Sequence, residues 1–171
     1  MQHQTQPNAV ALMTAVNFSE MRISTNPRET LVAFSIGSGM GVTIYDPICA
    51  IGGILNFLLP DSTSANGVNP EKIPFMFADT GIPAFLDALY EQGVRPERVK
   101  AVIAGGAHIM DQSGVFNIGG KNCEAVRTRL EHHRIAIRYA AIGGTISRTL
   151  SLEIGSGCNC IKMFGQGDEK I

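Results

Sequence analysis

The stretch AFSIGSGMGVTIYDP, residues 33–47, carries the strongest indication of the fold. It joins two apolar segments, residues 30–37 and 40–46, whose β-branched and aromatic side chains favour strands. Gly37 and Gly39 give the connection the backbone freedom that a tight turn needs. Such turns can display a nucleophile or bind a ligand, yet Ser38 alone in this turn has a nucleophilic side chain. The stretch therefore predicts two strands around a glycine turn and a candidate site at that turn.

Further strands are predicted on both sides of this turn. They are residues 20–24, 50–60, 99–107, 135–144, 145–155 and 158–164. We expect the first four strands of the chain to pair as antiparallel neighbours, because short connections separate them. Gly52 and Gly53 would weaken a strand interior, so they are expected to mark a bulge or a close backbone approach.

Two helices are inserted among the strands. The first is predicted over residues 78–93, where apolar side chains recur at helical spacing, with Asp79 or Thr80 as the cap and Gly93 as the end. The second is predicted over residues 117–134, with an apolar face of Cys123, Val126 and Leu130 and with His132, His133 and Arg134 in its last turn. Many strands with two inserted helices predict an α+β fold.

Composition indicates one domain. The 171 residues are 44% hydrophobic and 17% charged, which suits a single core. We expect a flexible tail over residues 1–17 and one domain over residues 18–171. A net charge of −1 disfavours nucleic acid as a partner. The sequence has no apolar run of bilayer length and no signal-peptide pattern. We therefore expect a cytoplasmic location and no membrane insertion.

The cysteines do not indicate a metal or disulfide site. There are four, Cys49, Cys123, Cys158 and Cys160, unevenly spread along the chain. Cys158 and Cys160 are too close in sequence for an ordinary zinc pair, and the adjacent His132 and His133 point to different faces of a helix. We therefore expect reduced thiols, no bound metal and no cofactor.

Five motifs, in order, resemble those of the chemoreceptor glutamine deamidases of bacterial chemotaxis, the CheD family. They are IGSGMGVTIYDP (36–47), GGILNFLLPDS (52–62), FADTGIPAFLDAL (77–89), AVIAGGAHIM (101–110) and NIGGKNCEAVRTRL (117–130). The resemblance covers roughly residues 18–164 and implies a layered α/β sandwich with its site at the glycine turn. It also implies hydrolysis of a glutamine side-chain amide by a cysteine, a histidine base and an orienting threonine.

This sequence departs from the family at all three of those positions. The cysteine position falls on Gly39, the histidine position on Asn56 and the threonine position on Ala33. Glycine has no side chain to act as a nucleophile, the asparagine amide does not titrate near neutrality, and alanine has no hydroxyl to donate a hydrogen bond. We therefore interpret the chain as a non-catalytic regulator with no catalytic residue intact.

The resemblance also implies partners, namely chemoreceptor cytoplasmic segments and a CheC-type phosphatase. The expected binding residues are Gly37, Ser38, Gly39, Met40, Asn56, Ile109 and Met110. Where the family commonly has an aromatic residue after its glycine pair, this chain has Ile109 and Met110, which could serve as apolar anchors.

Two other interpretations remain open. The first is a deamidase with relocated groups, in which Cys49 or Ser38 attacks and His108 assists. The second is a small-ligand binding module in which the backbone N–H groups of residues 38–41 line an emptied pocket.

Overall fold

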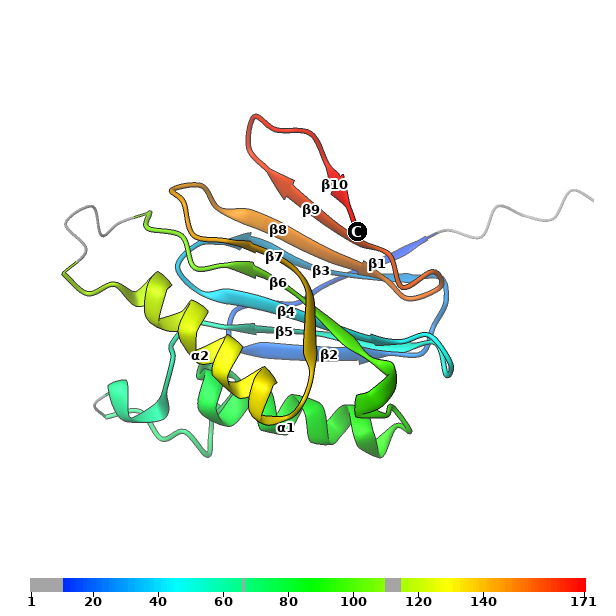
Figure 1. Ribbon diagram of the computed structural model, residues 1–171, viewed down its shortest axis with the longest axis horizontal. Helices are drawn as coiled ribbons and strands as arrows, with labels where there is room; N and C mark the ends of the chain where they lie inside the picture. Colours follow the sequence, from blue (N-terminus) through cyan, green and yellow to red (C-terminus); the bar gives the residue numbers. More distant parts are fainter. Residues whose placement is uncertain (1–10, 66, 110–114) are drawn as a thin grey trace, which may run out of the picture.

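The computed structural model describes residues 11–65, 67–109 and 115–171, which form two five-stranded sheets with both helices on the same side (Figure 1). One sheet has the strand order β1-β3-β8-β9-β10 and the other β2-β5-β4-β6-β7. The predicted α+β fold with mixed strands is confirmed. The elements are β1 (Leu12–Ala15), β2 (Glu20–Ser24), β3 (Glu29–Ile36), β4 (Met40–Asp46), β5 (Ile51–Phe57), α1 (Ala78–Glu91), β6 (Lys100–Gly105), α2 (Ile118–His132), β7 (Ala136–Ile142), β8 (Arg148–Glu153), β9 (Asn159–Met163) and β10 (Glu169–Lys170), with short 3₁₀ turns at Ser62–Ser64, Pro74–Met76 and Pro96–Arg98.

The pairing of the early strands differs from the prediction. β5 does pair antiparallel with both β2 and β4, but β3 lies in the other sheet, between β1 and β8. The chain therefore crosses between the sheets from β2 to β3 and again from β3 to β4. Alternation of apolar residues shows which face of a strand is buried but does not name its neighbour. The glycine turn of residues 37–39 is the second of these crossings.

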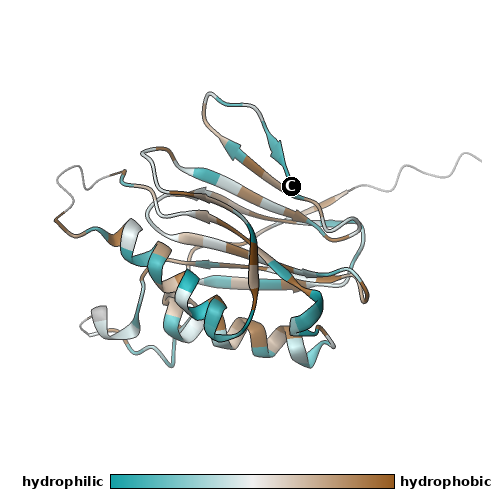
Figure 2. Cartoon of the chain, in the orientation of Figure 1, coloured by the Kyte–Doolittle hydropathy of each residue, from teal (hydrophilic) through white to brown (hydrophobic). Residues whose placement is uncertain are grey.

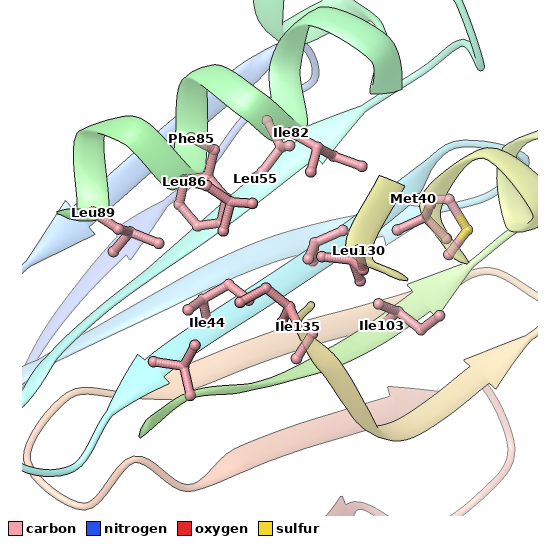
Figure 3. Close-up of a cluster of buried hydrophobic side chains, with 14 of the residues drawn as sticks. Met40, Ile44, Leu55, Ile82, Phe85, Leu86, Leu89, Ile103, Leu130 and Ile135 are labelled. Carbon is pink, nitrogen blue, oxygen red and sulfur yellow. The ribbon is translucent and has the colours of Figure 1, made fainter. Parts of the chain in front are cut away.

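Two hydrophobic layers hold the domain together. Residues of α1, including Ile82, Phe85 and Leu86, pack on the outer face of the β4–β5 pair, with Leu130 and Ile135 beside them (Figure 3). The helices alternate hydrophobic and hydrophilic residues along their length (Figure 2), as expected for helices with one buried face. A second cluster fills the space between the sheets and consists of residues such as Leu31, Ala33, Ile36, Ile54, Leu150 and Leu152.

Gly52 and Gly53 serve a close approach rather than a bulge. The register between β4 and β5 is continuous from Met40 to Asp46. A Cβ atom on Gly53 would lie 2.6 Å from the carbonyl oxygen of Arg22, and one on Gly52 would lie 2.8 Å from Tyr45 Cδ2. Side chains at these positions would push β2 and Tyr45 away from β5.

The expected N-terminal tail is partly structured. Residues Leu12–Ala15 form β1, which pairs in parallel with β3 from Glu29 to Val32, so the prediction of a flexible segment over residues 1–17 is wrong for this part. The sequence LMTA is too short to show alternation, and the strand is held by its pairing with β3. Residues 1–10 lie outside the described residues.

The first helix begins differently from the prediction. Its N-cap is Phe77, which makes no side-chain cap, and Asp79 lies inside the first turn. The Asp79 carboxylate instead accepts hydrogen bonds from the Ser62 backbone N–H at 3.0 Å and from its hydroxyl at 2.8 Å. The predicted end is confirmed, because Gly93 follows the C-cap Gln92 with a positive φ of 95°.

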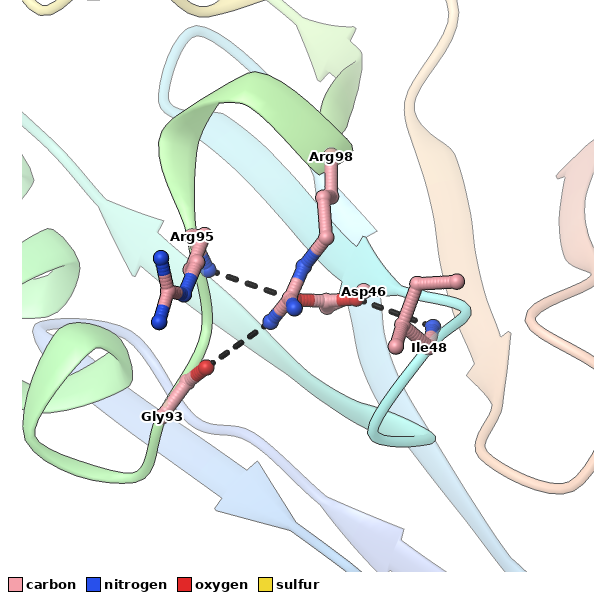
Figure 4. A network of polar contacts seen from close by, with 5 residues as sticks. All are labelled: Asp46, Ile48, Gly93, Arg95 and Arg98. Atoms are coloured by element: carbon pink, nitrogen blue, oxygen red, sulfur yellow. Dashed lines mark hydrogen bonds and ion pairs between the residues drawn. The ribbon is translucent and has the colours of Figure 1, made fainter.

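A buried carboxylate fixes the end of the domain opposite the glycine turn. Asp46, at the end of β4, is fully buried and forms an ion pair with Arg98 (Figure 4). It also accepts the backbone N–H of Ile48 at 2.9 Å and that of Arg95 at 3.2 Å. Burial alone would raise the pKa of the Asp46 carboxyl, but these donors outweigh burial and hold the pKa below its usual value.

Neither of the α-helices that the structure describes has the length and apolar character that a membrane-spanning helix needs.

Candidate functional site

The glycine turn opens into a pocket. Its volume is about 420 Å³, within the range of small-molecule and side-chain binding sites. The walls come from five parts of the chain: the segment before β2, the end of β3 with the β3–β4 turn, the segment after β5, the segment after β6 and the start of α2. The lining residues are Phe18, Ser35, Gly37, Ser38, Gly39, Leu58, Ala107, His108, Ile109, Phe116, Ile118 and Gly119.

Backbone hydrogen bonds hold the turn against the end of β6. The N–H of Gly106 donates to Gly39 O at 2.8 Å, and the N–H of Ala107 donates to Gly37 O at 2.9 Å. Gly105 has a positive φ of 128°, and a Cβ atom there would lie 2.2 Å from Gly39 O. The glycine pair at the end of β6, Gly105 and Gly106, is therefore required for the turn to dock.

Asn122 holds the β3–β4 turn in place through hydrogen bonds from its side chain. Its side chain is fully buried, and its Nδ2 donates to Ser38 O and to Leu58 O, each at 2.8 Å. Ser38 O belongs to the β3–β4 turn and Leu58 O to the segment after β5, so one side-chain amide connects these two parts of the pocket wall. From the sequence, Asn122 stands out only as part of the motif of residues 117–130, and this role is not predicted.

The start of α2 forms another wall. Asn117 caps the helix in a left-handed conformation, and its Oδ1 accepts the N–H of Gly120 at 3.2 Å. Gly119 packs directly on the turn after β6, since a Cβ atom there would lie 2.5 Å from Gly106 O. The positive end of the α2 dipole therefore lies at the pocket.

The expected binding residues divide into two groups. Gly37, Ser38, Gly39 and Ile109 line the pocket. The side chains of Met40 and Asn56 are instead buried and do not line the pocket, so their contact with a ligand stays a prediction. Met40 packs in the helix-side core, with its Sδ 3.9 Å from Cys123 Sγ. Met110 lies outside the described residues.

The three positions predicted to have lost catalytic groups are all enclosed. Ala33 is buried between the sheets. Asn56 is 1% exposed, and its Nδ2 donates to Val16 O at 3.2 Å while its Oδ1 has no hydrogen-bond partner among the described atoms. A Cβ atom on Gly39 would lie 2.6 Å from Phe57 O and 3.4 Å from Leu58 Cδ2. The backbone of β5 thus occupies the space that a side chain at residue 39 would need.

The candidate replacement groups are not equally placed. Ser38 and His108 both line the pocket. Cys49 lies in the β4–β5 connection, at the far end of the seven-residue strand β4 and so roughly 20 Å along the strand from the turn. Cys49 is exposed, and partial desolvation, followed by the nearby Asp46, raises the pKa of its thiol, which lowers its thiolate fraction. Cys49 is therefore not a candidate nucleophile for this pocket.

The other candidate ligands stay apart. His132 ends α2, about 21 Å along the helix from Ile118. Cys160 lies on β9 and Cys158 lies just before it. No group of three or more His, Cys, Asp or Glu side chains suited to a metal ion is found in the part of the chain that the structure describes.

Comparison with known proteins assigns the motifs. A family model described as CheD chemotactic sensory transduction matches residues 58–163. A protein of Solibacter usitatus named "Probable chemoreceptor glutamine deamidase CheD" is 44% identical over 156 residues, covering 91% of this chain and 92% of that protein. A protein of Symbiobacterium thermophilum with the same name is 35% identical, covering 93% of this chain and 97% of that protein. A protein of Syntrophus aciditrophicus named "Probable chemoreceptor glutamine deamidase CheD 1" is 37% identical, covering 88% of this chain and 93% of that protein.

Among solved structures, a Neisseria meningitidis protein of the family DUF152 has a TM-score of 0.46 and 7% sequence identity. The similarity covers 78% of this chain and 64% of that one.

Proposed function

Since this chain belongs to the CheD family of chemotactic sensory transduction proteins, we propose that it binds chemoreceptor cytoplasmic segments as a regulator without deamidating them. One observation carries the proposal: β5 fills the space at residue 39 where a nucleophile would project. The pocket beside that position remains open. The pocket is thus present, while the backbone of β5 blocks the position from which the nucleophile of the family would project.

Amide hydrolysis requires more than a shaped pocket. The amide carbon is a poor electrophile, so attack needs an activated nucleophile and a positioned base. The buried Asn56 and Ala33 supply neither a titratable group nor a hydroxyl. In a serine protease, removing the nucleophile or its base costs about 10⁶ in turnover. A loss of that order leaves binding as the useful property of the site.

Exposed apolar side chains at the pocket support a binding role. Phe18, Ile109 and Phe116 all line the pocket and are 52%, 43% and 69% exposed. Apolar side chains gathered at one hollow commonly mark a protein-binding surface. We propose this surface for the chemoreceptor and, as a second partner, for a CheC-type phosphatase.

The main alternative is a chemoreceptor glutamine deamidase with relocated groups. It is favoured by the names of the relatives and by the presence of Ser38 and His108 in the same pocket. Among the described residues, however, no hydrogen bond joins the Ser38 hydroxyl to His108. The backbone N–H of His108 donates to Gly144 O at 2.8 Å. A small-ligand module is a third candidate, supported by the pocket volume alone.

An ammonia-release assay on a chemoreceptor cytoplasmic fragment separates these functions. The parent protein, Ser38→Ala and His108→Gln would be compared, with mass analysis of each receptor glutamine. The proposal predicts no conversion by any of the three proteins and binding by the parent. Conversion by the parent that is lost in Ser38→Ala or His108→Gln would establish the relocated deamidase instead.

A further inference from the structure

The pocket offers hydrogen-bond donors. Ser35 and Ser38 contribute exposed hydroxyls, and His108 is half-buried at the wall. Hydroxyl and imidazole groups can each donate a hydrogen bond. Among the described lining residues, none is an aspartate or a glutamate. The side chains of this wall therefore suit an acceptor and present no negative charge to repel one.

The start of α2 adds to this preference. Ile118 and Gly119, the first residues of the 15-residue helix, line the pocket. The N-terminus of a helix carries partial positive charge and unpaired N–H groups that favour anions. The close contact of Gly119 with Gly106 O holds this end of the helix at the pocket wall.

A second positive group, Arg148, does not line the pocket but donates from its Nη1 to the carbonyl of Gly105, at the end of β6 that docks on the glycine turn, at 3.5 Å. Arg148 is only 7% exposed, and its Nη1 donates to Ile146 O at 3.2 Å. Its Nε is buried without a hydrogen-bond partner, and none of the ion pairs found among the described residues includes it. The loop above Arg148 also holds the pocket, because Gly144 O accepts the His108 N–H. A buried cation without a carboxylate partner raises the electrostatic potential nearby.

We infer that this pocket holds a glutamate side chain of a chemoreceptor segment in preference to a glutamine side chain. The inference rests on the proposed function and specifies the chemistry of its partner. A glutamate presents two acceptor oxygens and a negative charge, whereas a glutamine presents one acceptor and an amide that must itself donate. Glutamate is also the product that the named activity of the relatives leaves on a receptor. The protein would thus recognise the modified form of a receptor that it does not modify.

Binding to two forms of one receptor fragment tests the inference. A chemoreceptor cytoplasmic fragment would be prepared with its modifiable glutamines intact and with the same residues replaced by glutamate. Isothermal titration of the full chain should give a Kd about fivefold lower for the glutamate form, because charge-assisted hydrogen bonds are stronger than neutral ones. The ratio should shrink as salt is added.

Matched variants locate the preference. His108→Gln should reduce the ratio toward one, whereas His132→Gln, which changes an exposed histidine at the far end of α2, should leave it unchanged.

The outcomes distinguish the inference from the function beneath it. Equal binding of both forms, or tighter binding of the glutamine form, would overturn the inference and leave the proposed receptor binding intact. Absence of binding to both forms would overturn the proposed function itself. A ratio that falls equally in His108→Gln and His132→Gln would place the preference outside the pocket and refute the assignment.

Discussion

Replacing Gly39 by alanine tests whether the nucleophile position is closed. The added Cβ atom would lie 2.6 Å from Phe57 O, whereas ordinary contact begins at 3.4 Å, so the backbone of β5 must move by about 0.8 Å. Overpacking of this kind in a well-packed interior costs about 1–3 kcal/mol of unfolding free energy. For a domain of this size, that cost corresponds to a fall in Tm of roughly 2–12 °C.

Thermal unfolding followed by circular dichroism measures this cost. Gly167→Ala is the matched control, because nothing lies within 4 Å of a Cβ atom at that position and its φ is not in the left-handed region. We expect Gly167→Ala to unfold at or slightly above the Tm of the parent, since alanine restricts the unfolded chain. A Gly39→Ala protein as stable as the parent would refute the view that β5 excludes a side chain at residue 39.

Three further predictions concern buried polar groups. Asn122→Ala should lower the free energy of unfolding by about 2–3 kcal/mol, because two carbonyls lose their donor, as urea titration would show; no loss would contradict the fastening role. Asp46→Asn should lower the free energy of unfolding by about 3 kcal/mol at pH 7. Because the folded-state pKa of the Asp46 carboxyl is lowered, the difference in stability between parent and variant should vanish as pH falls from about 4 through that pKa; a difference that persists in acid would show that the carboxylate charge is not its cause. Thr43→Val should cost about 1–2 kcal/mol in the same assay, because it removes a 2.6 Å hydrogen bond to Asn159 between the sheets, whereas an unchanged stability would show that this bond contributes little.

Local patterns in the sequence predict the elements better than their partners. The helical spacing of Ile82 and Phe85 places α1 correctly, because that spacing follows directly from burial of one helix face. The β-branched runs place β4 and β6 for the same kind of reason. The position of β3 between β1 and β8, rather than beside β4, does not follow, since its alternation is satisfied by any sheet that buries Leu31 and Ala33.

The site shows the same limit. The glycine turn and Ile109 are predicted because their residue types or motifs are local signals. Asn122 is missed as a fastener because its acceptors, Ser38 O and Leu58 O, are brought to it only by the fold. Met40 and Asn56 are predicted at the pocket because they lie beside it in sequence or motif, but the structure turns their side chains into the interior.

Native mass spectrometry of the protein with a glutamine-containing chemoreceptor fragment tests the central claim most directly, because one spectrum reports both binding and chemistry. The account predicts a complex in which the receptor fragment keeps its original mass after prolonged incubation. A fragment whose mass shows conversion of glutamine to glutamate would contradict it.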